Sequence, residues 1–317
     1  MGKVAFVFPG QASQYSGMGR ELAEKYPIAR TVFDEADKAL GFAISKICFE
    51  GTEDELKLTA NTQPAILTVS VAAFRVLAEK GISPDYVAGH SLGEYSALVA
   101  AGALTFADAV RLVRKRGTYM QDAVPTGQGA MAAILGISPA VVQDACKRAA
   151  EGEICSAANL NSPEQTVISG HANAIKRAVE IASQSGAKRA VILPVSAPFH
   201  CALMMPAQEK LEKDLQATQF SDLQIPLVTN VDADSIRKGE EARQALVRQV
   251  CMPVLWEDSM RFRLDEDVRT FIEVGPGRVL TGIMRQIERS VTTLNVEDEK
   301  SLNATIERIV AAKIDAA

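Results

Sequence analysis

Long apolar runs, dense basic tracts and paired cysteines are all missing from this chain of 317 residues. No stretch approaches the roughly 18 apolar residues of a transmembrane helix, and the apolar residues 4–9 are too few for the core of a signal peptide. We therefore expect a cytoplasmic protein with no membrane partner. The net charge of -5 and the lack of a Lys/Arg-rich tract also argue against nucleic acid as a partner.

Cysteine and histidine are both scarce. The five cysteines are scattered and include no Cys-x-x-Cys pair, which favours a reducing compartment and does not fit a structural zinc site. We expect no bound metal. With only three histidines in the chain, the candidates for an imidazole base are His90, His171 and His200.

The segment Gly89-His90-Ser91-Leu92-Gly93 joins a short apolar strand at 86–88 to a helical pattern at 94–101. A Gly-x-Ser-x-Gly sequence between a strand and a helix is typical of a nucleophile elbow, a sharp turn that exposes the serine hydroxyl above a sheet. The glycines let the strand and the helix approach closely, and the backbone N–H of Leu92 is placed to stabilise a developing oxyanion. We therefore predict that Ser91 is a nucleophile.

A serine hydroxyl needs a base within hydrogen-bond reach. His90 is adjacent to Ser91, so at an elbow its side chain should point away. His171 follows a glycine at the start of a helical pattern, where a surface or capping role is favoured. His200 lies downstream of the serine on a loop, in the chain order of hydrolases, and we favour it as the base. The neighbouring Cys201 is interpreted as a buried, inert thiol.

Helical patterns at 19–40 and 63–80 precede the elbow, and strands and helices alternate on both sides of residues 126–197, as in a mostly parallel sheet covered on both faces. Residues 126–197 themselves follow the order β-α-β-β-α-β of a ferredoxin-like unit, with its first helix expected at 139–150 and its last strand at 188–195. We predict an α/β fold. In it, residues 1–125 and 198–317 form an α/β-hydrolase-like catalytic domain, and residues 126–197 form an inserted ferredoxin-like small domain.

The helical pattern at 105–120 carries four basic residues: Arg111, Arg114, Lys115 and Arg116. A run of charge usually marks a solvated face, and we expect this for at least three of them. An arginine turned inward is able to hold a carboxylate through two parallel hydrogen bonds.

Six short blocks stand in order along the chain: Phe8-Pro9-Gly10-Gln11-Ala12-Ser13-Gln14, Gly89-His90-Ser91-Leu92-Gly93-Glu94-Tyr95, Gln121-Asp122-Ala123-Val124-Pro125, Asn159-Leu160-Asn161-Ser162-Pro163, Pro198-Phe199-His200 and Glu273-Val274-Gly275-Pro276-Gly277. Together they resemble the malonyl-CoA:acyl-carrier-protein transacylases of fatty acid synthesis, and the likeness spans almost the whole chain. The resemblance implies ping-pong transfer of a malonyl group from malonyl-CoA to the phosphopantetheine thiol of acyl carrier protein. It implies no further cofactor, and we expect a monomer.

The resemblance also implies roles for individual positions. Ser91 matches the nucleophile and His200 its base, while the backbone N–H groups of Gln11 and Leu92 match the oxyanion hole. Arg116 matches the arginine that binds the malonyl carboxylate.

Four further positions match this family or its relatives. The backbone carbonyl of Gln249 matches the group that orients the histidine, so the family needs no acidic third member. His90 and Asn159 match pocket positions. Phe199, also a candidate pocket residue, departs from family members that carry a serine before the histidine. In related acyltransferases, a phenylalanine before the histidine is associated with the use of malonyl rather than methylmalonyl units. We therefore predict malonyl selectivity.

Two other functions share these motifs. A serine hydrolase or thioesterase uses the same elbow chemistry, and a non-catalytic scaffold is able to bind carrier proteins through the same fold. Carrier proteins are acidic as a class, so on this net-negative chain we expect docking through a local basic patch. The candidate clusters are Arg111, Arg114 and Lys115, or Lys176, Arg177, Lys188 and Arg189.

Overall fold

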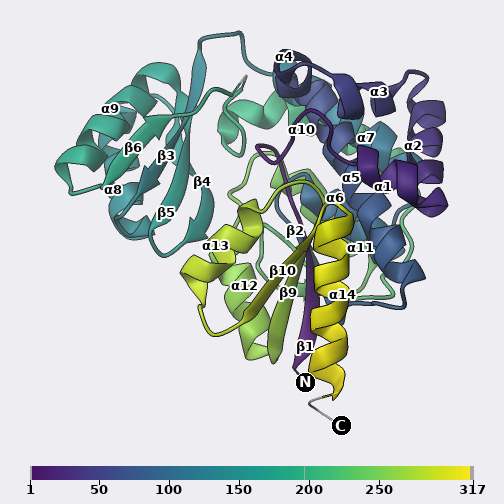
Figure 1. Cartoon of the computed structure of the whole chain (residues 1–317). Helices are drawn as coiled ribbons and strands as arrows, with labels where there is room; N and C mark the ends of the chain where they lie inside the picture. The colour runs from purple at the N-terminus through teal and green to yellow at the C-terminus, as the bar shows by residue number, and fades with distance from the viewer. Residues whose placement is uncertain (1, 196, 315–317) are drawn as a thin grey trace.

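Within residues 2–195 and 197–314, which this computed structural model describes, the strands form two separate sheets (Figure 1). The larger sheet has six strands in the order β10 (Thr292–Val296), β9 (Val268–Val274), β1 (Lys3–Phe8), β2 (Tyr86–Gly89), β7 (Leu227–Val228) and β8 (Ser235–Ile236). All neighbouring pairs are parallel except β7 with β8. The predicted mostly parallel sheet is therefore confirmed.

Both faces of the larger sheet are buried. Successive residues of β1 point to opposite faces, so Phe6 and Phe8 join one hydrophobic cluster while Ala5 and Val7 join another. Helices α5 (Thr59–Glu79), α6 (Gly93–Ala100) and α7 (Phe106–Asp122) contribute to the first cluster, and α12 (Trp256–Asp265) and α13 (Val279–Ile287) to the second. This layering fixes the carboxyl ends of β1 and β2 side by side.

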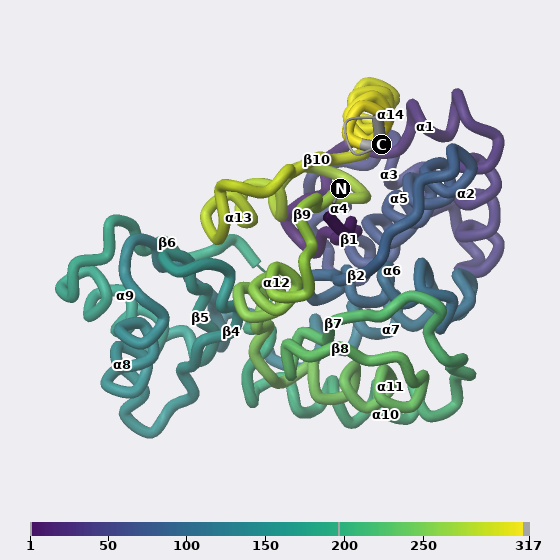
Figure 2. The backbone as a smooth tube through the Cα atoms, turned by 90° about the horizontal axis from the view of Figure 1, so that it is seen from below, coloured from purple at the N-terminus to yellow at the C-terminus, as the bar shows by residue number. Residues whose placement is uncertain are grey.

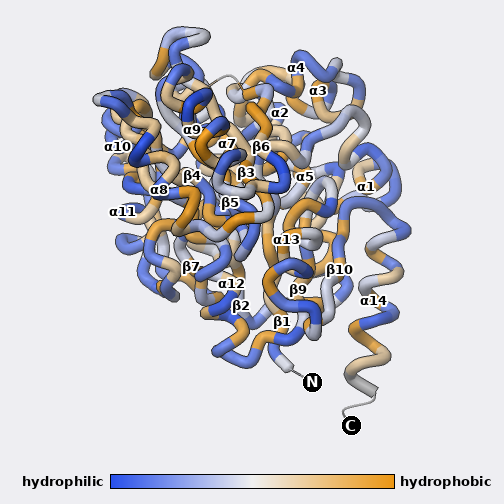
Figure 3. Tube along the Cα trace, turned by 90° about the vertical axis from the view of Figure 1, so that its left-hand side faces the viewer, coloured by the Kyte–Doolittle hydropathy of each residue, from blue (hydrophilic) through white to orange (hydrophobic). Residues whose placement is uncertain are grey.

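The remaining helices surround this layered core. Four short helices gather against α5 (Figure 1): α1 (Arg20–Lys25), α2 (Pro27–Leu40), α3 (Ile44–Glu50) and α4 (Glu53–Lys57). Helix α14 (Glu299–Ile314) packs on β10 at one edge of the sheet, whereas α10 (Met205–Ala217), which follows the short helix η1 (Ala202–Met204), and α11 (Gly239–Gln249) lie together at the other edge (Figure 2). Hydrophilic and hydrophobic stretches alternate along α14, as expected of a helix with one buried face (Figure 3). Among the described residues, no helix combines the length and hydropathy needed to cross a membrane.

The smaller sheet has four antiparallel strands in the order β4 (Cys155–Ser162), β5 (Gln165–His171), β3 (Gly129–Leu135) and β6 (Arg189–Ile192). Helices α8 (Pro139–Ala150) and α9 (Ala172–Gln184) cover it and enclose a hydrophobic cluster of its own. This is the β-α-β-β-α-β order predicted from the sequence. The predicted boundaries of the two domains stay a prediction, and their residues 1, 196 and 315–317 lie outside the described residues.

One edge of the small sheet is bonded to the larger unit. The backbone N–H of Leu160 on β4 donates to the carbonyl of Val254 at 2.9 Å, and the N–H of Val254 donates to the carbonyl of Ala158 at 2.8 Å. This backbone bridge fixes β4 against the segment that leads into α12. Side chains of β4 are thereby held beside the carboxyl ends of the parallel strands.

Prolines explain two differences from the expected helices. The helical pattern at 19–40 is divided into α1 and α2 because Tyr26, which precedes Pro27, is extended. Helix α5 begins at Thr59, earlier than the predicted start at Gln63, and so includes Pro64 in its interior. Proline has no N–H to offer the carbonyl of Ala60, and that carbonyl accepts from Arg114 Nη1 at 2.7 Å instead.

Candidate active site

Ser91 occupies the sharp turn between β2 and α6. Its φ of 51° lies in the left-handed region, as a strained nucleophile turn requires. A Cβ on Gly93 would lie 2.1 Å from the carbonyl oxygen of Phe8, and one on Gly89 would lie 1.9 Å from Gly93 itself. Only glycine fits at both places, and the turn therefore holds Ser91 at the carboxyl end of the sheet.

His200 lies directly beside this serine. Its Nε2 is 2.7 Å from Ser91 Oγ, and its Nδ1 is 2.8 Å from the backbone carbonyl oxygen of Gln249. Because a carbonyl oxygen only accepts, Nδ1 carries the hydrogen and Nε2 is left to accept the hydroxyl proton. Burial, with a smaller effect from the charge of Arg116, lowers the pKa of His200 to about 3. The imidazole is therefore neutral near pH 7, as a general base must be.

Arg116 reaches the same hydroxyl from α7, and its side chain is fully buried. Nη2 donates to Ser91 Oγ at 3.0 Å and to Gln249 Oε1 at 3.0 Å, while Nη1 donates to Gln63 Oε1 at 2.8 Å. Burial lowers the pKa of Arg116, and the nearby Tyr95 and Glu94 oppose that shift. A cation is therefore placed against the nucleophile.

The other basic residues of α7 do not enter the site. Arg111 and Lys115 are exposed, and Lys115 Nζ lies 2.5 Å from Asp214 Oδ1. Arg114 is half-buried against the Ala60 carbonyl. Of the four, only Arg116 turns inward.

A cavity of about 380 Å³ lies between the carboxyl ends of β1 and β2 and the small sheet. Ser91 and His200 line it, and so do the four predicted pocket or oxyanion residues: Gln11, His90, Asn159 and Phe199. His90 Nε2 lies 2.9 Å from Asn161 Oδ1, and the His90 ring sits beside Trp256 with centroids 5.3 Å apart. His90 thus faces the cavity while its ring nitrogen is bonded to the small sheet.

Two backbone N–H groups border the nucleophile. Gln11 follows β1 and Leu92 follows Ser91, and the loops that carry them pack so closely that a Cβ on Gly10 would lie 2.5 Å from the His90 carbonyl oxygen. Within the described residues, neither the N–H of Gln11 nor that of Leu92 has an acceptor in the protein. Two donors are therefore available to a charge that develops at the serine.

Sequence reasoning missed several residues that hold the site together. Asn230 accepts the N–H of Ser91 at 2.6 Å and donates through Nδ2 to the carbonyl of Gly89 at 2.7 Å, so it secures the turn. Gln63 holds Arg116. Neither residue belongs to a motif quoted from the sequence, and their places follow only from the packing of α5 and of the loop after β7.

The histidine and cysteine set aside as catalytic candidates have structural contacts. His171 stands at the N-cap position of α9, but its side chain makes no cap hydrogen bond, and Nδ1 accepts the backbone N–H of Ile154 at 2.9 Å instead. Cys201 is buried, its Sγ lies 3.2 Å from the Pro198 carbonyl oxygen, and burial raises the pKa of its thiol. The buried thiol agrees with the interpretation from the sequence, whereas the expected capping by His171 is replaced by this contact to the residue before β4.

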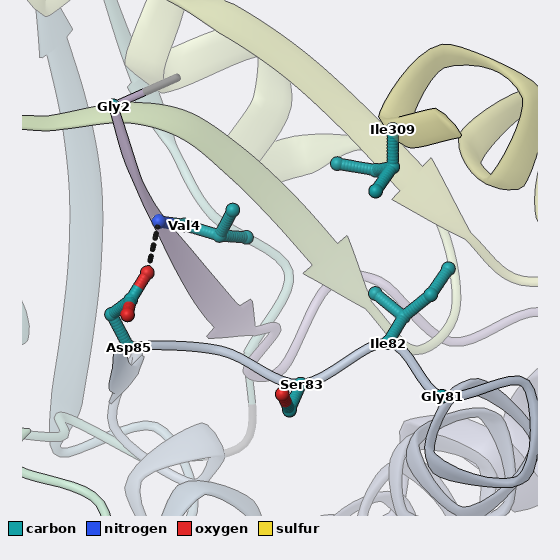
Figure 4. A pocket seen from close by; sticks show the side chains of 7 residues that line it. All are labelled: Gly2, Val4, Gly81, Ile82, Ser83, Asp85 and Ile309. Carbon is teal, nitrogen blue, oxygen red and sulfur yellow. Dashed lines mark hydrogen bonds between the residues drawn. The ribbon is translucent and has the colours of Figure 1, made fainter. Parts of the chain in front are cut away.

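A second cavity of about 220 Å³ lies at the amino ends of the strands (Figure 4). It is lined by Gly2, Val4, Gly81, Ile82, Ser83, Asp85 and Ile309. The Asp85 carboxylate accepts the backbone N–H of Val4 at 2.8 Å and so supports the amino end of β1. None of the predicted site residues lines this cavity.

A mostly parallel sheet with a nucleophile elbow, a neutral histidine on the serine and a buried arginine beside it is the arrangement of enzymes that transfer acyl groups through a serine. The chain belongs to the acyl transferase domain family, whose model matches residues 5–308.

Relatives within the family are similar over almost their whole length. The malonyl CoA-acyl carrier protein transacylase of Bacillus subtilis (strain 168) is 49% identical over 310 residues, which is 98% of this chain and 98% of the relative. The crystal structure of the protein of that name from Clostridium perfringens has a TM-score of 0.96 at 40% identity and covers 99% of each chain. A malonyl-transacylase in complex with a type II PKS acyl-carrier protein has a TM-score of 0.94 at 46% identity, and the match covers 96% of this chain and 99% of that one. These likenesses confirm the predicted fold class.

Proposed function

We propose that this protein transfers a malonyl group from malonyl-CoA to the phosphopantetheine thiol of an acyl carrier protein, for fatty acid synthesis. One observation carries the proposal: the half-buried hydroxyl of Ser91 lies 2.7 Å from a histidine nitrogen and 3.0 Å from an arginine nitrogen. The histidine suits a nucleophile, and the arginine suits an acyl group with a free carboxylate. The names of the relatives support the same substrate class.

The first half-reaction forms an acyl-serine. His200 Nε2 takes the hydroxyl proton as Ser91 Oγ bonds to the thioester carbon, and the N–H groups of Gln11 and Leu92 stabilise the oxyanion. The C–S bond then breaks, and the imidazolium returns its proton to the departing coenzyme A thiolate. In the second half-reaction, the carrier's thiol gives its proton to His200 and attacks the carbonyl of the acyl-serine. The bond to Ser91 Oγ then breaks, and the imidazolium returns the proton to Oγ, which restores the free hydroxyl.

Arg116 selects and orients the acyl group. Its Nη2 exchanges the contact with Ser91 Oγ for the malonyl carboxylate, which a guanidinium binds through two parallel hydrogen bonds. The ion pair is strong because the site is buried, and it holds the thioester carbonyl against the oxyanion donors. Closing the cavity around the acyl-serine also keeps water from hydrolysing it.

Intact mass after mixing with malonyl-CoA tests the covalent step. We expect one malonyl adduct on the wild type and none on Ser91→Ala. An unmodified wild type would favour the scaffold alternative, and an equal adduct on Ser91→Ala would remove the serine mechanism.

The hydrolase alternative makes a different prediction for the products. With labelled malonyl-CoA and holo carrier protein, transfer should outpace release of free malonate. If malonate release is faster, and Arg116→Ala leaves the use of malonyl-CoA intact, the protein is a thioesterase.

We further propose a cytoplasmic monomer with two domains, 1–125 with 198–317 and 126–197. The separate hydrophobic cluster of the small sheet supports this division. The proposed reaction draws only on side chains and backbone groups of this chain. It therefore calls for no cofactor besides the two substrates, the thioester malonyl-CoA and the thiol of the carrier protein. Light scattering of the pure protein tests the monomer.

A further inference from the structure

Glu94 is a buried carboxylate that the proposed mechanism does not use. It stands in the first turn of α6, three residues after the nucleophile, and it is 1% exposed. Oε2 accepts Gln249 Nε2 at 2.8 Å and the backbone N–H of Asn230 at 3.1 Å, while Oε1 has no partner within the described residues. Burying a carboxylate without full pairing costs free energy, so we expect Glu94 to make a contribution to the site that offsets this cost.

That contribution lies in the amide of Gln249, which stands between the Arg116 guanidinium and the Glu94 carboxyl group. Burial raises the pKa of Glu94 to about 7, but its Oε2 accepts from Gln249 and Asn230 whether or not the other oxygen carries a proton. The Oε1 of the Gln249 amide accepts Arg116 Nη2 at 3.0 Å, and its Nε2 donates to Glu94 and to the backbone carbonyl of Ser91. Turning the amide over would set its NH₂ against the guanidinium and its oxygen against the carboxylate, so Glu94 fixes which way the amide points. No direct ion pair joins Glu94 to Arg116 within the described residues.

This spacing matters for a residue that has to bind a substrate carboxylate. A direct partner would occupy the guanidinium and compete with the malonyl group. An amide in between orients the guanidinium and leaves its edge at Ser91 Oγ available.

We propose that Glu94 is a positioning residue that acts through the Gln249 amide to hold Arg116 ready for the carboxylate of the acyl donor. The inference deepens the proposed function and rests on it. Glu94 touches neither the substrate nor the reacting atoms. Its effect should therefore appear with carboxylated acyl donors and much less with neutral ones.

A double-mutant cycle tests whether Glu94 acts through Gln249: Glu94→Met, Gln249→Met and the pair, each assayed for acylation of Ser91 by malonyl-CoA and by acetyl-CoA. In Glu94→Met, the NH₂ of Gln249 loses its side-chain acceptor at residue 94 and the amide loses its orientation. We expect kcat/KM for malonyl-CoA to fall about tenfold or more, and that for acetyl-CoA less than about threefold. Once Gln249 is methionine, adding Glu94→Met should change the malonyl-CoA value less than about threefold.

Glu273→Met is the matched control. Glu273 is also a buried carboxylate, but it caps α13 through the N–H groups of Leu280 and Thr281. We expect that variant to lower the melting temperature and to leave the malonyl-to-acetyl ratio unchanged.

Several results would overturn the inference. Equal losses with both donors in Glu94→Met, or a full loss that persists in the Gln249→Met background, would make Glu94 merely structural. If Glu94→Met fails to fold, Gln249→Met alone must lower acylation by malonyl-CoA and spare acetyl-CoA. A wild type that forms no malonyl-serine would overturn the proposed function and this inference with it, whereas variants that match an active wild type would overturn the inference alone.

Discussion

Phe199 precedes the proposed base and is 7% exposed on the wall of the cavity. An aromatic ring beside the acyl-serine leaves little room for an α-methyl group on the acyl chain. We predict that Phe199→Ser lowers the preference for malonyl-CoA over methylmalonyl-CoA by about 1 to 3 kcal/mol, or roughly five- to 150-fold in the ratio of kcat/KM values. Val279→Ala, on another wall of the cavity, is the control and should keep the preference. Comparable use of both donors by the wild type would refute the proposed selectivity.

We propose Arg116 as the residue that gives the preference for acyl donors with a free carboxylate. Arg116→Lys keeps a charge but loses the planar fork that contacts Gln63, Gln249 and Ser91. We predict a loss of about 2 to 5 kcal/mol in kcat/KM for malonyl-CoA and a much smaller loss for acetyl-CoA. Arg114→Lys, on the same helix but outside the cavity, should leave both values near those of the wild type. A similar loss in both arginine variants would mean that α7 itself had been disturbed.

The pH dependence of stability follows from His200. Its folded pKa of about 3 lies below the ordinary value near 6.5, so the unfolded chain binds the extra proton first as the pH falls. His200 therefore costs no stability above pH 6.5 and destabilises the fold progressively from pH 6.5 towards 3. Between pH 7.5 and 5, we predict that the free energy of unfolding falls by about 2 kcal/mol more in the wild type than in His200→Gln. Urea unfolding at the two pH values measures this, and equal falls would contradict a buried neutral histidine.

The residues of the candidate site differ in how well the sequence alone predicts them. Ser91 is found from its own motif, because the chemistry of an elbow demands glycines two residues away on each side. His200 and Arg116 lie far from it in the sequence, and only position and family likeness selected them. Gln63, Asn230 and the amide of Gln249 were out of reach, because their roles arise where separate elements meet and leave no local pattern.

Among the helices, α7 and α13 each carry a glycine in a position where alanine is the better helix former. Gly117 of α7 packs on the start of α5, and a Cβ there would lie 2.5 Å from the backbone oxygen of Thr59. A Cβ on Gly282 of α13 would meet no atom within 4 Å, apart from its chain neighbours and the backbone of its own helix. Replacing these two glycines by alanine should therefore change the free energy of unfolding in opposite directions.

We predict that Gly117→Ala destabilises the protein by about 1 to 3 kcal/mol through overpacking, and that Gly282→Ala stabilises it by about 0.5 to 1 kcal/mol. Thermal unfolding of the two variants beside the wild type measures both. Gly117→Ala should also lower activity, because α7 carries Arg116 one residue earlier. Stabilisation by both changes would show that helix propensity outweighs the contact between α7 and α5.

Element boundaries were predictable where one local signal dominates. Helix α8 begins at a proline, and its predicted span, Pro139 to Ala150, agrees with the structure. The strand expected at 188–195 ends early, with β6 at Ile192, and residues 193–195 line the cavity instead. A run of apolar residues indicates burial, but it does not distinguish a strand from a cavity wall, because both are apolar.

At the scale of the whole molecule, the two sheets form one reaction site together. The cavity takes the nucleophile from the large sheet and Asn159 and Asn161 from β4. The chain order already predicted two units, because β-α-β-β-α-β interrupts an alternating pattern. The backbone bridge between β4 and Val254 gave no signal in the sequence, since backbone pairing of an edge strand is independent of side-chain type.

The two basic clusters proposed for carrier-protein docking differ in how far they are neutralised. On α7, Lys115 and Arg111 are ion-paired with Asp214 and Asp108, and Arg114, the third member, is half-buried against the Ala60 carbonyl. In the second cluster, on α9 and at the start of β6, Arg177 and Lys188 are paired with glutamates, while the exposed Lys176 and Arg189 have no ion pair among the described residues. Exposed, unpaired charge gives the stronger attraction for an acidic partner, so we propose the second cluster as the docking surface.

Arg189 also begins β6, and β6 leads within four residues to Leu193 on the wall of the cavity. A carrier protein bound there would lie on the strand that leads to the cavity, which its phosphopantetheine group has to enter to reach Ser91. We predict that Lys176→Glu with Arg189→Glu raises KM for the carrier protein about tenfold at low salt, and less at high salt because the attraction is screened. Acylation by malonyl-CoA should not change. Arg111→Glu with Lys115→Glu is the matched control, and a larger effect on KM from that pair would move the docking surface to α7.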